Sequence, residues 1–405
     1  MNNRIIIVGG GAAGMMAAII ARRNGSYVTI LERNDRVGKK LLATGNGRCN
    51  YTNRYLNLEN FHGSNEKFIK EVLDSFSVDR TIDFFEHLGI TPSIEDDGKV
   101  FPLSYQSSSM LDVLRQEMEH LGIELITDAQ VVSISKQDMF HVKLKDNSIL
   151  NCDKLILATG GMAMPVSGSD GIGHRLAKEL GHTVTDLYPS LVQLKLKGNI
   201  FKQIKGVKVV GKVGVYKNNK LLREDSGDIL FTDYGISGPP ILQISRNAIV
   251  SDFNDVVLRV NLMGNKRFEV VKEYLVNRFA YMGHKKLTES LIGFVNKRLI
   301  LPIVKEVNLN KDMMVAHLTM EDIEKLTKLF TDWRFEITGH NGWGQAQTTA
   351  GGVLTDEIKS RTMESKKVDG LYIIGELLDV DGDCGGFNLQ WAWSSGYLAG
   401  SGASN

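Results

Sequence analysis

Residues 4–32 read RIIIVGGGAAGMMAAIIARRNGSYVTILE. Residues 4–8 are rich in β-branched side chains and unbroken by polar ones, so they are predicted to form a buried strand. A glycine run follows, and then an apolar helical stretch that ends near Asn24 and Gly25, a typical helix stop. A second buried strand is expected over residues 27–31. The stretch therefore predicts a βαβ unit at the start of an α/β domain.

The glycines of this unit are spaced as GxGxxG, at Gly9, Gly11 and Gly14. This spacing lets the chain turn sharply and lets a pyrophosphate approach the first amides of a helix, where the free N–H groups and the helix dipole favour anions. Glu32 ends the second strand, 23 residues after Gly9, where a carboxylate accepts ribose hydroxyls. Because a carboxylate there disfavours a 2′-phosphate, the unit predicts a site for FAD or NAD rather than NADP.

Composition sets limits on other functions. The 405-residue chain has 48 Lys and Arg against 47 Asp and Glu, so its formal net charge is +1. That average gives no global attraction to nucleic acid or an anionic membrane, although a local patch could hide in it. Three cysteines without a CxxC pair and nine histidines without HxH or HExxH support neither a disulfide framework nor a metal site. We expect a cytoplasmic protein with no metal and no nucleic-acid or membrane partner, as a monomer or small homo-oligomer.

Later elements favour FAD over NAD. Three short strands are expected near residues 130–136, 139–145 and 148–153, before a buried strand that ends in Thr159, Gly160 and Gly161. Near the C-terminus, a strand ends in Gly375 and Glu376 and is followed by a turn and a helix. Flavoproteins of the two-dinucleotide-binding type have a similar arrangement. In them the N-terminus of the last helix points at the flavin and can stabilise negative charge on it.

The middle of the chain has a different texture. Residues 190–265 read mostly as strands, with a turn expected at 225–228, and residues 266–331 read as polar-faced helices. Strand character returns from Trp333, and a glycine-rich stretch begins at Ala346. We therefore predict a discontinuous FAD-binding domain, residues 1–188 and 346–405, interrupted by a β-rich insertion (189–265) and a mostly helical insertion (266–345).

Several longer segments resemble the BaiN/YhiN-like flavoprotein family, which includes enzymes described as aminoacetone oxidases and bile-acid-pathway enone reductases. They are GKKLLATGNGRCNYTN (38–53), FTDYGISGPPIL (231–242), TTAGGV (348–353) and TMESKKVDGLYIIGELLDVDGDCGGFNLQWAWSSGYLAG (362–400). The resemblance covers essentially the whole chain. It implies a non-covalent FAD in an α/β, Rossmann-like domain of the two-dinucleotide-binding type, interrupted by a β-barrel-like plus helical insertion.

The predicted FAD site combines the fingerprint with positions that the resemblance implies. It comprises Gly9, Gly11, Ala12, Ala13, Gly14, Glu32, Arg33, Lys39, Lys40, Gly45, Asn46, Gly47, Arg48, Cys49, Asn50, Val132, Thr159, Gly160, Gly161, Asp170, Gly375, Glu376, Asp381, Gly385, Gly386, Phe387, Asn388 and Leu389. Arg48 is expected to contact the flavin or pyrophosphate, with a structural salt bridge as the alternative. Lys39 and Lys40 either reach a phosphate or lie in solvent. The thiols of Cys49 and Cys384 are expected to pack rather than to form a redox disulfide.

The catalytic group is not evident from the sequence. Tyr105 is a candidate proton donor and His340 a candidate pocket residue, against the plainer readings of an exposed tyrosine and a loop histidine. Since no second dinucleotide fingerprint is present, NAD(P)H would have to bind transiently on an exposed face of the flavin.

Three functions follow from these observations. The first is reduction by NAD(P)H of an activated, enone-type C=C bond in a small molecule, with hydride added to the β-carbon and a proton to the α-carbon. The second is oxidation of an amine or aminoketone by O2, giving H2O2, which the missing nicotinamide domain favours. The third is an RNA-modifying or methyl-transferring flavoprotein, which the small net charge disfavours.

Overall fold

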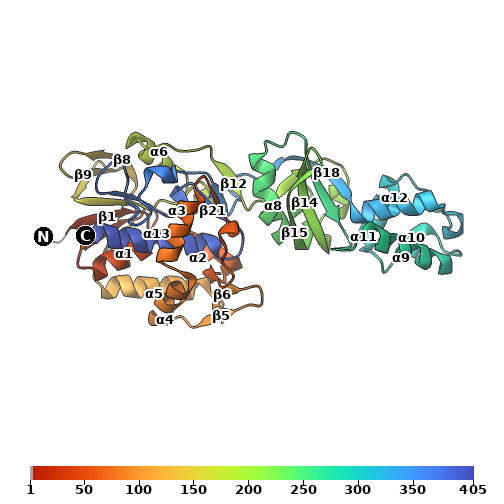
Figure 1. Cartoon of the computed structure of the whole chain (residues 1–405), viewed down its shortest axis with the longest axis horizontal. Coiled ribbons are helices and arrows are strands. Elements are labelled where there is room, and N and C mark those ends of the chain that lie inside the picture. The colour runs from red at the N-terminus through yellow and green to blue at the C-terminus, as the bar shows by residue number, and fades with distance from the viewer. Residues whose placement is uncertain (1–2) are drawn as a thin grey trace. The chain divides into compact units, whose positions relative to one another are not determined.

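The computed structural model describes residues 3–405 (Figure 1). The chain separates into two compact units. Unit 1 comprises the chain up to Pro189 together with Gln347–Asn405, and unit 2 comprises Ser190–Ala346. The domain boundaries expected from the sequence differ from these by one residue. The finer division of the insertion at residue 265 stays a prediction.

Unit 1 is built on a five-stranded parallel sheet in the order β20-β11-β1-β2-β7. Its strands are β1 (Arg4–Val8), β2 (Tyr27–Leu31), β7 (Glu124–Ile126), β11 (Lys154–Leu157) and β20 (Leu371–Ile373). The chain leaves β1 for β2 on one side and later adds β11 on the other, so the strand order reverses at β1. In open α/β sheets, ligands bind outside the carboxyl ends of the strands at such a point.

Unit 1 also contains smaller sheets. The three strands expected from sequence form an antiparallel sheet of β8 (Val131–Lys136), β9 (Phe140–Leu144) and β10 (Ile149–Cys152). The others are β3 (Thr52–Asn53) with β6 (Lys99–Pro102) and β5 (Pro92–Ile94), β4 (Phe61–Gly63) with β21 (Val380–Gly382), and β12 (Tyr188–Ser190) with β19 (Thr348–Ala350).

The helices of unit 1 enclose a single hydrophobic core. They are α1 (Ala12–Arg23), α2 (Lys39–Ala43), α3 (Glu66–Ser75), α4 (Val78–His87), α5 (Ser107–His120), α6 (Ile172–Glu179) and α13 (Phe387–Ser404). The C-terminal helix α13 packs along α1 (Figure 1). A Cβ added at Gly396 would lie 2.6 Å from the carbonyl oxygen of Ala13, and one at Gly400 would lie 2.5 Å from that of Ala17. Glycine is therefore required for this close approach of the two helices.

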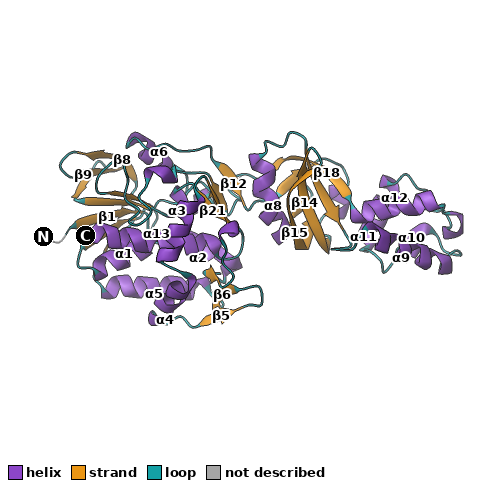
Figure 2. Cartoon of the chain, viewed as in Figure 1, coloured by secondary structure: helices purple, strands orange, loops and turns teal. Residues whose placement is uncertain are grey.

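Unit 2 contains a closed barrel in the order β13-β16-β15-β14-β17-β18 (Figure 2). Its strands are β13 (Leu194–Leu196), β14 (Lys208–Lys217), β15 (Lys220–Phe231), β16 (Gly235–Ser237), β17 (Val256–Asn261) and β18 (Trp333–His340). The barrel, the Rossmann-like sheet and the helical insertion confirm the fold class expected from the sequence.

The turn expected at residues 225–228 is wrong. Those residues lie inside β15, and the chain reverses at Asn218 and Asn219, both of which have positive φ. A two-residue turn of this kind matches the twist of the flanking strands. Two acidic residues of β15 form ion pairs with lysines of β14, through the Lys208 Nζ–Asp228 Oδ2 and Lys212 Nζ–Glu224 Oε1 contacts of 2.6 Å each. This cross-strand pairing keeps an otherwise turn-like sequence in the barrel.

The helices of unit 2 are α7 (Phe201–Ile204), α8 (Pro239–Val250), α9 (Phe268–Tyr281), α10 (Leu287–Ser290), α11 (Lys297–Glu306) and α12 (Met320–Thr331). The last four form the helical part predicted from sequence, and β18 then returns the chain to the barrel. Across residues 3–405, no helix has the length and apolar character needed to cross a membrane.

Candidate functional site

A cavity opens in unit 1 where four parallel strands end. The residues that follow β1, β2, β11 and β20 all contribute to its wall, namely Gly9–Ala13, Glu32, Thr159–Gly160 and Gly375–Glu376. A parallel sheet places the carboxyl ends of its strands at one edge, so segments more than 300 residues apart in the sequence meet there. The cavity therefore lies where the strand order predicts a ligand site.

The three fingerprint glycines have different surroundings. A Cβ at Gly9 would lie 2.4 Å from the carbonyl oxygen of Ala158, and one at Gly14 would lie 2.0 Å from that of Gly9. A Cβ at Gly11 would have nothing within 4 Å, because Gly11 faces the cavity. Gly11 is also the N-cap of α1 and supplies no capping side chain. The first amides of α1 thus remain available to an anion in the cavity, which fits a dinucleotide pyrophosphate.

Glu32 is buried at the cavity wall. Its Oε2 accepts a hydrogen bond from the Gly10 amide at 2.9 Å, and its Oε1 accepts from the backbone and side-chain nitrogens of Asn34 at 2.9 and 2.7 Å. These donors hold the carboxylate in place against the glycine turn. Since a carboxylate oxygen has two lone pairs, at least one acceptor position remains for a ribose hydroxyl.

Cations line one side of the cavity, and each is held by an acid. Lys40 Nζ lies 2.5 Å from Glu376 Oε2, and Glu376 Oε1 accepts from the Thr349 amide at 3.0 Å. Lys39 Nζ lies 2.8 Å from Asp35 Oδ1, and Arg33 pairs with Asp170. Lys39 and Lys40 therefore border the cavity while held in ion pairs. The sequence left open whether they reach a phosphate or lie in solvent, and this arrangement is intermediate between the two.

The structure also identifies cavity residues that the sequence did not. Ser167, Gly168 and Ser169 lie in the wall, as do Gln130 and Val131, one residue from the predicted Val132. The buried Ser169 hydroxyl has no hydrogen-bond partner among the described residues, so it is available to a bound molecule. The predicted Asp170 directly follows Ser169 and was the usable signal for this segment. Gln347 and Thr348 also line the cavity, and their position beside the glycine-rich 348–353 stretch was a usable signal.

The predicted FAD residues divide into two groups. Those that line the cavity are Gly9, Gly11, Ala12, Ala13, Glu32, Arg33, Lys39, Lys40, Thr159, Gly160, Gly375, Glu376, Asn388 and Leu389. Those outside its wall are Gly14, Gly45, Asn46, Gly47, Arg48, Cys49, Asn50, Val132, Gly161, Asp170, Asp381, Gly385, Gly386 and Phe387. The second group still includes neighbours in space, since Asn53 donates to the Gly385 carbonyl at 3.0 Å and joins the 45–53 and 385–388 segments.

Arg48 and Tyr105 form a cluster outside the cavity. The Arg48 guanidinium lies 3.4 Å from Glu95 Oε1 and stacks over Phe101, with 4.6 Å between its carbon and the ring centroid. These contacts are the ones expected if Arg48 forms a structural salt bridge, which is the alternative to a role in binding the cofactor. The Tyr105 hydroxyl bonds to Ser93 Oγ at 2.8 Å, and its side chain is exposed. The catalytic role of Tyr105 stays a prediction.

His340 lies in unit 2, on β18. Its Nδ1 accepts a hydrogen bond from the Gly342 amide at 2.9 Å, and its ring lies near that of Phe253. Burial, aided by the charge of Lys195, lowers its pKa and favours the neutral ring. Its role likewise stays a prediction.

The three cysteines, all within the described residues, form no disulfide bond. Cys49 is fully buried, and burial raises its pKa to about 12, so it remains a protonated packing group at neutral pH. Cys152 is also buried. Cys384 is exposed, so the packing expected for its thiol is not confirmed.

Comparison with known proteins identifies a family and several relatives of this chain. Residues 3–402 match a protein family described as HI0933-like protein Rossmann domain. The chain is 37% identical to a 3-dehydro-bile acid delta(4,6)-reductase of Clostridium scindens over 94% of this chain and 93% of that protein. It is 32% identical to a ribosomal RNA dihydrouridine synthase of Escherichia coli (92% and 91% covered), and 29% identical to one of Haemophilus influenzae (92% and 91%).

Among solved structures, the chain is similar to a flavocytochrome c3 fumarate reductase. The TM-score is 0.51 at 17% identity, over 100% of this chain and 78% of that one. A 3-ketosteroid delta1-dehydrogenase from Sterolibacterium denitrificans gives a TM-score of 0.50 at 12% identity, over 98% and 99%. These likenesses establish the fold.

Proposed function

Because the chain belongs to the HI0933-like Rossmann-domain family of flavin-dependent oxidoreductases, we propose that it reduces an enone-type C=C bond, with FAD as cofactor and NAD(P)H as electron donor. The observation that carries this proposal is the cavity at the carboxyl ends of β1, β2, β11 and β20, with Gly11 open to it and Glu32 in its wall. A C=C reductase at 37% identity supports the reaction type.

Three groups in the cavity wall would hold different parts of the cofactor. The α1 amides beyond Gly11 would bind the pyrophosphate, Glu32 would accept ribose hydroxyls, and the Ser169 hydroxyl would donate to or accept from the bound molecule. When bound, the flavin supplies the hydride chemistry. The Lys40–Glu376 pair fixes the loop after β20 against α2 and so keeps the cavity wall in place.

The overall reaction balances with one nicotinamide and one proton. NAD(P)H loses a hydride, the β-carbon of the alkene gains a hydride, and the α-carbon gains a proton from the protein or from water. The nicotinamide is thereby oxidised and the alkene reduced by two electrons. A carbonyl conjugated to the double bond is needed because it accepts the electron density displaced by the hydride. A cytoplasmic location, which would supply NAD(P)H, stays a prediction from the cysteine pattern.

An anaerobic absorption experiment tests the proposal. The purified protein, reconstituted with FAD, should be yellow, lose its visible absorbance on addition of NADH or NADPH, and recover it on addition of a small enone. A protein that cannot be reconstituted with FAD would contradict the cofactor assignment. A protein bleached by a nicotinamide but not re-oxidised by any activated alkene would contradict the reductase assignment.

A second candidate substrate is a uracil base in RNA. Two relatives, 32% and 29% identical over 92% of this chain, are named as ribosomal RNA dihydrouridine synthases. The C5=C6 bond of uracil is conjugated to a carbonyl, so the same reaction type covers both substrates. Re-oxidation of the reduced protein by ribosomal RNA but not by small enones would select this candidate.

The amine oxidase remains the alternative for the same fold. It predicts that an aminoketone bleaches the flavin without any nicotinamide and that air then yields H2O2. The names of the relatives reported above do not favour it, and failure across a panel of primary amines would remove it.

A further inference from the structure

The small net charge of the chain conceals two units of opposite charge. Unit 2, residues 190–346, has 24 Lys and Arg against 16 Asp and Glu, a formal charge of +8. The rest of the chain has 24 against 31, a formal charge of −7. Charge asymmetry between parts of a chain is typical of proteins that bind nucleic acid with one part. The whole-chain average of +1 therefore says nothing about such a partner.

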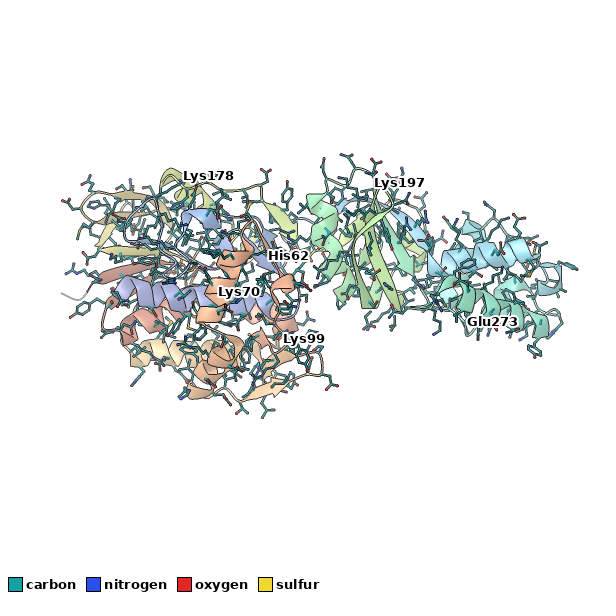
Figure 3. The ribbon with its side chains drawn as sticks, viewed as in Figure 1. His62, Lys70, Lys99, Lys178, Lys197 and Glu273 are labelled. Carbon is teal, nitrogen blue, oxygen red and sulfur yellow. The ribbon has the colours of Figure 1, made fainter. Side chains whose placement is uncertain are left out.

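Part of the positive charge of unit 2 comes from one segment of its sequence. Residues 191–223 contain eight lysines and one arginine and no acidic residue. Lys197, which projects from the barrel in Figure 3, belongs to this segment. Several of these lysines are neutralised by acids elsewhere in unit 2, including Lys205 by Asp233 and Lys212 by Glu224. An external anion would therefore bind to those lysines and arginines of unit 2, inside or outside this segment, that have no acidic partner.

Three unpaired cations meet at one surface pocket of unit 2. Lys266 and Arg267 lie on the turn from β17 to α9, and Lys328 lies near the end of α12. All three are exposed, and in the described chain their side chains have no acidic or hydrogen-bonding partner. The pocket is further lined by Lys212 and Asn265. Side chains from the barrel and from two helices therefore converge on it.

The acids of the pocket cancel only part of this charge. Asp332 Oδ2 accepts from Arg334 Nε at 2.8 Å, and Asp332 also lies beside Arg259, so its charge is already compensated. Glu269 is the remaining acid in the lining. The α9 N-terminus opens here as well, with Arg267 as an N-cap that provides no side-chain hydrogen bond. Its first amides add donors to the three free cations.

We propose that this surface of unit 2, defined by Lys266, Arg267 and Lys328, binds the phosphate backbone of RNA. The inference rests on the second candidate substrate above and assigns it a docking surface. Lysine and arginine contacts to phosphates position a nucleic acid without reading its sequence. The bases would therefore be recognised elsewhere, and this surface would supply affinity.

The test compares two triple variants of the full chain, each reconstituted with FAD. The first is Lys266→Glu, Arg267→Glu and Lys328→Glu. The control is Arg115→Glu, Lys145→Glu and Lys178→Glu, which changes the net charge equally but on exposed residues of unit 1. Lys178 is labelled in Figure 3. A triple Gln variant of the first set covers the case in which three new acids disturb folding.

Binding is measured by fluorescence anisotropy with a labelled single-stranded RNA of about 30 nucleotides from ribosomal RNA, between about 50 and about 200 mM KCl. We expect the Glu variant to bind at least about tenfold more weakly than wild type, and the control to change less than about threefold. The salt slope should become shallower by about 2, from three phosphate contacts at about 0.7 each.

Three outcomes would overturn the docking surface. They are no RNA binding by the wild-type chain, equal loss in both triple variants, and tighter binding to anionic phospholipid vesicles than to RNA. Reduction of a small enone is measured on the same samples. Loss of RNA binding with enone reduction retained separates the two functions. A wild-type chain that binds RNA at this surface but reduces nothing would leave the docking surface standing and refute the reductase.

Discussion

At the scale of single residues, His174 is the buried group whose energetics the structure defines most sharply. It lies in the first turn of α6, and neither ring nitrogen has a hydrogen-bond partner among the described residues. Burial, with a smaller contribution from Lys178, lowers its pKa from 6.5 to about 4. Because the unfolded chain takes up the proton first, stability is complete above pH 6.5 and declines as the pH falls toward 4.

This shift predicts that unit 1 loses about 2 kcal/mol of unfolding free energy between about pH 7.5 and about pH 5. The variant His174→Leu should lose that pH dependence and be no less stable at neutral pH, since it removes an unsatisfied buried polar group. Urea unfolding at the two pH values measures both quantities. His120→Gln, an exposed histidine on α5, is the control and should behave as wild type. An unchanged pH response in His174→Leu would refute the assignment.

At the scale of elements, the β1–α1 turn separates glycines needed for the fold from the one needed for the ligand. Gly14→Ala should destabilise the apo protein by about 3 kcal/mol, because the added Cβ has no room beside the Gly9 carbonyl. Gly11→Ala should leave apo stability within about 0.5 kcal/mol. It should weaken the binding of FAD by a factor of about ten or more, because the added methyl group enters the cavity.

Thermal unfolding of the apo proteins and FAD titration followed by absorbance distinguish the two variants. The contrast between them is the informative result, since either variant alone could fail for an unrelated reason. A Gly11→Ala protein that binds FAD as tightly as wild type would place the pyrophosphate away from the α1 N-terminus.

At the scale of the whole molecule, unit 2 is an insertion, and the two segments of unit 1 that flank it are joined to each other. Val184 bridges Val353, and the Thr185 amide donates to the Gly352 carbonyl at 2.9 Å. We therefore expect residues 191–346 to be replaceable by a Gly-Ser linker of about six residues, with unit 1 still folding and binding FAD.

The linker variant should retain the yellow colour and lose RNA binding, while residues 190–346 expressed alone should bind RNA. Absorbance and anisotropy on the two separate polypeptides check this. If the linker variant kept full RNA affinity, the docking surface would have to lie in unit 1. If it were colourless, unit 2 would be necessary for the cofactor site.

Sequence alone was sufficient for the features that depend on neighbouring residues. The run of β-branched residues at 4–8, the glycine spacing after it and the stop at Gly25 each act over a few positions, so strand, turn and helix were all predicted where they occur. The same holds for the three strands at residues 131–152 and for the helices that follow residue 266. Local conformation has local causes, and those are visible in the chain.

Tertiary structure decided what depends on distant segments. Residues 225–228 form strand rather than the expected turn because they pair with β14, where Lys208 also binds Asp228. Gly396 and Gly400 are required only because α1 passes beside them. Ser169 lies in the same cavity wall as Gln130 and Gly375 only because long-range packing brings these segments together. Likewise, Lys266 and Lys328 became one cationic surface only when β17, α9 and α12 were brought together. Such groupings are set by packing between segments that are far apart in the chain, and this packing leaves no signal in the local sequence.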